Sequence, residues 1–482
     1  MSFVSFEFLL LVAVTVPVYY LLPHRRRWMC LLAASVVFYL SYNPAYLLFL
    51  AVSILTTYAS GLLIGGRETS RHKKLWVVLS LLVNLGILLT LKYLNFFASL
   101  FTGFHGTAPK FDLILPAGIS FYTFQSLSYT VDVYRGDVKP ERSFGKYALF
   151  VSFFPTLLSG PIQKAKEALP RLEEEHFFSY DEARRGWLLI VFGYFEKSVV
   201  ADRLAVPANT VFAAPANYHG LSVIAAVLCY TLQIYCDFAG YSNIAIGVSE
   251  LLGFRLAKNF DRPYFAVSVR DFWRRWHISL STWFRDYLYF PLGGNRCSMA
   301  RQCFNVMTVF AVCGLWHGAS LTFLAWGVLH GLYQIASRLT KQPRKAICGK
   351  LRIDTSSGPA HAAAVAFTFV LVAFAWIFFR ADTMENAFAV MGSIFRFDPA
   401  DFANGSLLQL GLTGPELTVA LAGICIVWLT DLFQKKTDLR AALLKKGTAV
   451  RWSVYITAAL ALLFFGQYGP INGAQSFIYA QF

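Results

Sequence analysis

The chain has 482 residues, of which 56% are hydrophobic and 15% are charged. Soluble domains carry about 25% charged residues, so this composition excludes a chain of soluble domains, and it equally excludes a disordered, coiled-coil or collagen-like protein. The apolar content is sufficient for many membrane spans of roughly 20 residues each. The composition therefore predicts an all-α, polytopic membrane protein.

The net charge of +16 is concentrated in short clusters between apolar runs. Such clusters are typical of cytoplasmic loops that face an anionic leaflet, so we predict contact with a lipid bilayer and no nucleic-acid partner. The eight cysteines form no CxxC pair, and we expect no disulfide framework. The basic clusters are His24 to Arg27, Arg67 to Lys74, Arg270 to Arg275, Lys341 to Arg352 and Lys435 to Lys446.

The first apolar run, Phe6 to Leu22, is interpreted as a span rather than a signal peptide. Glu7 stands at its front, no positive charge precedes it, and basic residues follow it. Further runs cover residues 28–42, 46–64 and 75–97. With the N-terminus outside, the two inside loops hold seven Lys or Arg residues, whereas the outside loops up to Asp112 hold only Lys110. This asymmetry predicts that the N-terminus lies outside.

Beyond residue 112 the apolar runs become uneven. Residues 113–125 and 148–162 are short runs broken by proline and glycine, which are tolerated where protein or a water-filled cavity surrounds them. Longer runs return at residues 187–206, 221–252, 304–337, 362–379, 417–432 and 452–465. We expect about ten or eleven spanning helices plus re-entrant segments. No polar stretch reaches the roughly 50 residues of a small domain, so residues 1–482 are predicted to form a single membrane-embedded domain.

The polar segment from Asn259 to Asp286 is the first candidate site. At helical spacing Arg270, Arg274, His277 and Ser281 share one face. One interpretation is an interfacial helix whose arginines meet lipid headgroups. The other is a cationic mouth for an anionic donor, because guanidinium groups pair well with phosphate oxygens. The hypothesis of a substrate site includes Asn259, Arg274, Arg275, Trp276 and Asp286, together with Trp316 further along the chain.

The second candidate site is His317, preceded by Trp316, inside the long apolar run 304–337. An ionisable side chain within a membrane run is unfavourable and is by default a functional hypothesis. Gly314 and Gly318 flank it and allow a helix break or a close backbone approach. A desolvated histidine stays neutral and can act as a general base towards a hydroxyl or thiol. For His330, thirteen residues later, a satisfied buried histidine is the favoured interpretation. No GxSxG, GxxxxGK[ST] or HExxH signature occurs, and no metal site is predicted.

At these residues the chain resembles the membrane-bound O-acyltransferase family, and in particular its bacterial branch of O-acetylation membrane components. The resemblance covers most of the chain. The matching stretches are residues 115–125, 132–135, 153–155 with 159–162, 237–242, 272–296 and 314–319.

The resemblance implies a multi-helix fold around a tunnel-like core, with His317 as the catalytic histidine and His277 as the family's second histidine. It also implies transfer of an acetyl group from a cytoplasmic donor, acetyl-CoA, across the membrane of a bacterial cell. A partner protein with an extracytoplasmic SGNH-type domain would then acetylate a polysaccharide or wall polymer. No bound cofactor is expected.

Two alternatives stay open at this point. A close branch of the family transfers D-alanine to teichoic acid, although Pro291 to Arg296 looks more like the acetylating branch. Broken helices around a buried polar centre are also compatible with a polymer transporter that carries out no chemistry.

Overall fold

The computed structural model describes residues 1–66, 69–102, 111–351, 354–396, 398, 405, 409–469, 474–475 and 477–478. Three residues of the predicted charge pattern, Arg67, Lys110 and Arg352, lie outside the described residues. Every regular element in the described part of the chain is a helix, so the all-α prediction is confirmed. The chain divides into two compact units, and the single-domain assignment stays a prediction.

The first unit comprises residues 1–193 and 241–258. Helices α3, α4 and α6 contact one another in it, and polar side chains join them. Asn84 on α4 accepts a hydrogen bond from Ser53 on α3 over 2.6 Å, a type of link that stabilises helix contacts in lipid. Its elements are α1 (Phe6–Leu21), α2 (His24–Leu40), α3 (Tyr46–Gly65), α4 (Ser70–Leu88), η1 (Leu89–Tyr93), α5 (Leu94–Thr102), α6 (Ile119–Arg135), α7 (Phe144–Ser152), α8 (Ala165–Glu173) and most of α9 (Tyr180–Tyr194).

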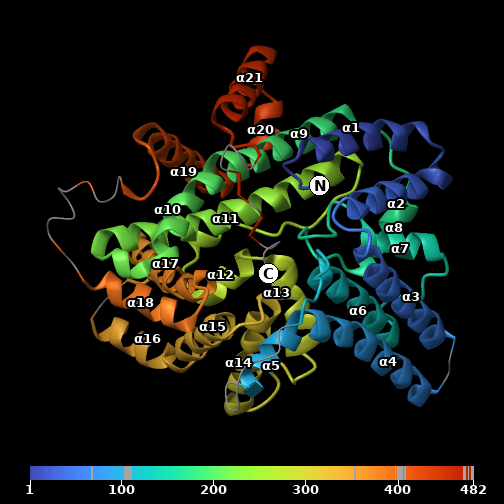
Figure 1. Cartoon of the computed structure of the whole chain (residues 1–482), viewed down its shortest axis with the longest axis horizontal. Coiled ribbons are helices and arrows are strands. Elements are labelled where there is room, and N and C mark those ends of the chain that lie inside the picture. The colour runs from blue at the N-terminus through green and yellow to red at the C-terminus, as the bar shows by residue number, and fades with distance from the viewer. Residues whose placement is uncertain are drawn as a thin grey trace. The chain divides into compact units, whose positions relative to one another are not determined.

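The second unit comprises residues 194–240 and 259–482 and contains both candidate sites. Helices α12 and α17 both contact α15, which contacts α14 along its length (Figure 1). The elements are η2 (Phe195–Ala201), α10 (Asp202–Ala213), η3 (Pro215–Asn217), α11 (Gly220–Leu251, up to residue 240), η4 (Pro263–Phe265), α12 (Val269–Arg275), α13 (Ile278–Phe284), η5 (Arg285–Tyr289), α14 (Met299–His317), α15 (Leu321–Leu339), α16 (Lys341–Lys350), α17 (Gly358–Arg380), α18 (Met384–Ile394), α19 (Gly414–Gln434), α20 (Leu439–Leu444) and α21 (Thr448–Phe465).

Six helical stretches of the described chain are long and apolar enough to cross a membrane, which agrees with the prediction of a polytopic membrane protein. Helix α1 is apolar but shorter. Several other predicted runs are divided: residues 187–206 form α9, η2 and α10 in succession. The six stretches are Tyr46–Gly65, Ser70–Phe101, Gly220–Leu251, Gly358–Arg380, Gly414–Gln434 and Thr448–Phe465.

The prediction that Arg270, Arg274, His277 and Ser281 share one helix face is wrong, because the helix ends at Arg275. Trp276 is extended and His277 adopts a left-handed conformation, with φ 44° and ψ 55°. A neighbouring segment supplies the backbone partners at this break. The N–H of Ile278 donates to the carbonyl of Asn259, and the N–H of residue 261 donates to the carbonyl of residue 275, each over 2.9 Å.

The apolar run 304–337 also breaks, and it does so directly after His317. Helices α14 and α15 then cross with their backbones in contact. A Cβ atom at Gly314 would lie 2.3 Å from the carbonyl oxygen of Phe323, and one at Gly327 would lie 2.2 Å from that of Phe310. Only glycine at these two positions allows the approach that packs α15 beside His317.

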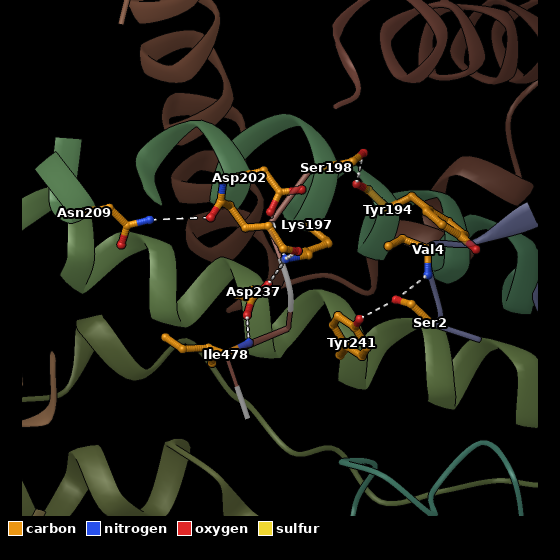
Figure 2. Close-up of polar contacts among 11 residues, drawn as sticks. Ser2, Val4, Tyr194, Lys197, Ser198, Asp202, Asn209, Asp237, Tyr241 and Ile478 are labelled. Carbon is orange, nitrogen blue, oxygen red and sulfur yellow. Dashed lines mark hydrogen bonds and ion pairs between the residues drawn. The ribbon is translucent and has the colours of Figure 1, made fainter. Parts of the chain in front are cut away.

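A buried ion cluster joins η2, α10 and α11 to the C-terminal segment. Lys197 Nζ lies 2.8 Å from a carboxylate oxygen of Asp202 and 2.6 Å from one of Asp237, and all three side chains are at most 2% exposed. Figure 2 shows Lys197 between the two acids and the N–H of Ile478 directed at Asp237, a hydrogen bond of 2.8 Å. Lys197 also donates to the carbonyl of Gln475 over 3.0 Å. The cluster therefore holds Gln475 against η2 and Ile478 against α11.

Removing Lys197 should destabilise the protein strongly, because it leaves two buried carboxyl groups without their cation. We expect Lys197→Met to lower the free energy of unfolding by about 3–5 kcal/mol. The triple variant with Asp202→Asn and Asp237→Asn should recover most of that loss. Thermal unfolding in detergent measures both effects, and equal melting temperatures for the single and triple variants would contradict the electrostatic explanation.

Candidate functional site

His277 lies at the break between α12 and α13, and Asn259 holds its imidazole ring. Asn259 Oδ1 lies 3.1 Å from His277 Nδ1 and also accepts hydrogen bonds from the backbone N–H and the hydroxyl of Ser279. Because a carbonyl oxygen only accepts, this network assigns the proton to Nδ1 and the lone pair to Nε2. Burial lowers the pKa of His277 to about 3, so the ring is neutral near pH 7. Neutral His277 can therefore accept a proton or a hydrogen bond at Nε2.

His317 is the last residue of α14 and is 2% exposed, enclosed by aromatic rings. Its ring centroid lies 4.9 Å from that of Trp316, 5.1 Å from Trp326 and 5.1 Å from Phe379. The ring of Trp316 also contacts His277, with centroids 6.0 Å apart. The structure thus brings the two predicted histidines to the same indole, although they are 40 residues apart in the chain.

His330 is a buried histidine with a defined partner, in agreement with the favoured interpretation. Its Nδ1 accepts a hydrogen bond from Trp273 Nε1 over 3.2 Å. Trp326 lies between it and His317, since the indole centroid is 5.0 Å from one imidazole and 5.1 Å from the other. His317 and His330 lie on different helices, α14 and α15.

A pocket of about 450 Å³ opens between α12, α13, α14 and α15. Four arginines line it: Arg270, Arg274, Arg285 and Arg338. Its inner wall includes Trp273, Phe310 and Cys313, and Cys313 lies one helical turn before His317. The pocket is therefore positively charged where it opens, and its inner wall borders the aromatic rings around His317.

The other predicted substrate residues occupy different positions. Arg275, next to Arg274 in the chain, pairs with Asp271 over 3.0 Å and lines a separate groove. Asp286 pairs with Arg285 of the basic pocket over 2.8 Å. Trp276 is 1% exposed and stacks on Phe272, with ring centroids 5.4 Å apart. We interpret Trp276 as a buried wall of the site, whereas Arg274 faces the pocket.

Sequence reasoning missed two features of this region. Asn295 Oδ1 accepts hydrogen bonds from Tyr289 over 2.7 Å and from Arg338 over 3.1 Å, so it holds a guanidinium of the basic pocket. Phe238 packs edge-on against His277, with centroids 4.7 Å apart. Both residues belong to the motifs behind the family resemblance, but a motif does not reveal which side chain each residue contacts. In the described residues no group of three or more His, Cys, Asp or Glu side chains is arranged to hold a metal ion.

Comparison with known proteins defines the class of this chain. Residues 141–375 match the model of the membrane-bound O-acyltransferase family. A probable alginate O-acetylase of Pseudomonas putida is 35% identical over 480 residues, 96% of each chain. A peptidoglycan O-acetyltransferase of Helicobacter pylori is 34% identical over 76% of this chain and 73% of its own. A teichoic acid D-alanyltransferase of Streptococcus thermophilus is 29% identical over 48% of this chain and 58% of its own.

The chain belongs to the membrane-bound O-acyltransferase family. It is accordingly a membrane-embedded acyltransferase, and the transporter without chemistry loses its support. The resemblance found in the motifs is thereby confirmed, and both candidate histidines lie inside the matched range.

The burial of His277 predicts a pH dependence of stability. Its folded pKa of about 3 lies below the ordinary value of 6.5, so between these values the unfolded chain binds a proton that the folded chain excludes. Its contribution to the free energy of unfolding is therefore lost as the pH falls below about 6.5, by up to about 1.4 kcal/mol per pH unit. We expect the melting temperature of His277→Gln to fall less between pH 7.5 and 5.5 than that of the unchanged protein.

The matched control is His361→Gln, which removes an exposed histidine. It should retain the full pH dependence. An identical fall in melting temperature for His277→Gln and the unchanged protein would show that His277 is not held neutral by burial.

Proposed function

We propose that this acyltransferase moves an acetyl group from cytoplasmic acetyl-CoA to an acceptor for O-acetylation of an exported polysaccharide or wall polymer. The observation that carries the proposal is the position of His317, which is buried in aromatic side chains one helical turn from the wall of a pocket lined by four arginines. The alginate and peptidoglycan O-acetylation named for the relatives supports a polymer as the final acceptor.

The basic pocket suits a donor that carries phosphate groups. Arginine binds phosphate oxygens through paired hydrogen bonds, and four arginines can compensate several negative charges. Coenzyme A presents its phosphates at one end and its thioester at the other. With the phosphates near Arg274 and Arg338, the thioester end would extend along Trp273 and Cys313 towards His317. Arg274 is thus the donor contact that the geometry favours over Arg275.

The proposed chemistry at His317 is general-base catalysis. The imidazole takes the proton of the acceptor hydroxyl as the oxygen attacks the thioester carbonyl. A C–O bond forms, the C–S bond breaks, and the departing thiolate receives the proton from the imidazolium. Such a base contributes roughly 10²–10⁴-fold to the rate. The surrounding rings exclude water and would protect the activated acetyl group from hydrolysis.

The proposed setting is a bacterial cytoplasmic membrane, with the N-terminus outside. The excess of Lys and Arg in the presumed inside loops, seven residues against one, supports this orientation. It puts the first two basic clusters on the cytoplasmic side, and we propose that the donor binds from that side. We further propose an extracytoplasmic partner with an SGNH-type esterase-like domain that places the acetyl group on the polymer. D-alanyl transfer to teichoic acid is the second candidate, because a D-alanyltransferase is among the relatives.

Replacement of His317 should abolish transfer while the protein still folds. We expect His317→Ala, purified in detergent with labelled acetyl-CoA, to lose at least about 10²-fold in acetyl turnover, because the general base is gone. Membrane abundance should stay near normal. The matched control is His330→Gln, which removes a second imidazole from the same aromatic cluster and keeps a hydrogen-bond acceptor for Trp273. Full turnover in His317→Ala would refute the assignment.

Replacement of Arg274 should weaken donor binding selectively. We expect Arg274→Ala to raise the dissociation constant of acetyl-CoA about tenfold, since a charge-assisted hydrogen bond contributes about 1.5–3 kcal/mol. Arg275→Ala should have a smaller effect, because Arg275 already pairs with Asp271 outside the pocket. Binding assays at several salt concentrations separate the two arginines. If neither change affects binding, the arginines meet lipid headgroups instead.

A further inference from the structure

The second unit contains another hollow that the proposed reaction does not use. It is a groove of about 690 Å³ between α11, α17 and α19, closed at the back by the loop around η4. All three helices are long and apolar enough to span a membrane. An apolar groove between membrane-spanning helices is exposed to lipid acyl chains. The polar groups at its ends therefore determine which molecule it binds.

The polar groups of the groove gather at one end. The first half of α17 and the second half of α19 border the groove. His361 at the start of α17 and Lys435 at the end of α19 therefore both line it. Asp431, one turn before Lys435, accepts a hydrogen bond from Tyr235 on α11 over 2.8 Å. The loop adds Arg262 and Arg275. Arg262 and Arg275 each pair with a carboxylate, Asp261 and Asp271, and Lys435 adds a third cation, so the basic side chains of the lining are gathered at this end.

The backbone at Arg262 supports a built site. Arg262 and His277 are the two non-glycine residues in the described chain with positive φ, and Arg262 has φ 51°. Strain of this kind persists where the surroundings impose it and concentrates at functional positions. The side chain donates through Nε to Asp261 over 2.9 Å and still lines the groove. Arg262 is thereby fixed at the mouth rather than free to extend into solvent.

The walls of the groove suit an apolar chain. The stretch of α17 that borders it, from His361 to Val370, is about 14 Å long, and most of the residues that α17 and α19 contribute to the lining are apolar. An acyl chain below an anionic headgroup matches both the apolar walls and the basic residues at one end.

We propose that this groove binds an anionic glycerophospholipid, with an acyl chain along α17 and α19 and the phosphate at Arg262 and Lys435. Lipid tails are as apolar as the groove, so the selectivity comes from the headgroup and not from burial of carbon. The lipid would also lie behind the site. Tyr235 lines the groove and contacts the ring of Trp276, with centroids 6.2 Å apart, and Trp276 precedes His277.

The test uses the full chain in detergent and native mass spectrometry with phosphatidylglycerol and phosphatidylcholine of identical acyl chains. We expect phosphatidylglycerol to be retained in preference. The double variant Arg262→Gln/Lys435→Gln should lose at least about fivefold of that retention, with phosphatidylcholine unchanged. Arg275 stays intact because it is a candidate donor contact. The control Lys445→Gln/Lys446→Gln removes the same charge outside the groove and should retain the preference.

A steric pair tests the apolar part. Ala366→Trp fills the groove and should abolish retention, whereas Ala363→Trp, on the same helix and also exposed but not part of the lining, should not. Equal retention of both lipids, or unchanged phosphatidylglycerol binding in Ala366→Trp, would overturn the proposal. So would displacement of the lipid by glycerol 3-phosphate alone, which would indicate a phosphate site without an acyl groove.

Discussion

The arrangement of this enzyme depends on the need to satisfy every backbone N–H and C=O group within the protein wherever water is absent. Both candidate histidines lie where a helix ends, and the end of a helix leaves backbone N–H and C=O groups without a partner within the helix. At His277 the segment beginning at Asn259 supplies the missing partners, with hydrogen bonds to residues on either side of the break. At His317 the hydroxyl of Ser320 accepts from the N–H of Phe323 and starts the next helix. Each break therefore has to be enclosed by neighbouring elements, and this enclosure also desolvates the imidazole.

Aromatic rings link the two histidines into one site. Trp316 contacts both, while Trp326 contacts His317 and also His330, whose Nδ1 accepts from Trp273. Such rings exclude water from both imidazoles. The close packing of α14 and α15 at Gly314 and Gly327 keeps this wall in place.

The sequence predicted the class of fold, because long apolar runs are a strong signal, and it singled out two histidines that the structure brings to the same indole. It also indicated that Gly314 and Gly318 would allow a break or a close approach: Gly314 allows the backbone approach of α15, and Gly318 follows the end of α14 and lies against the ring of Phe323. The prediction of a shared helix face was wrong at His277, because the residue pattern of a helix continues there although the backbone of His277 is left-handed. A non-glycine residue in that conformation has no local signature; the contacts with Asn259 and Phe238 impose it, and they come from distant parts of the chain.

The same limit applies to charge. The cluster from Arg270 to Arg275 reads as one basic patch, yet successive residues of a helix point about 100° apart. On the short helix α12, Arg270 and Arg274 face the pocket beside α14, whereas Arg275 turns to Asp271 and to the groove beside α17. One run of cations therefore borders two cavities, the basic pocket beside α14 and the largely apolar groove beside α17. Net charge counted along the chain cannot separate them, since the division arises only when α12 is packed between its neighbours.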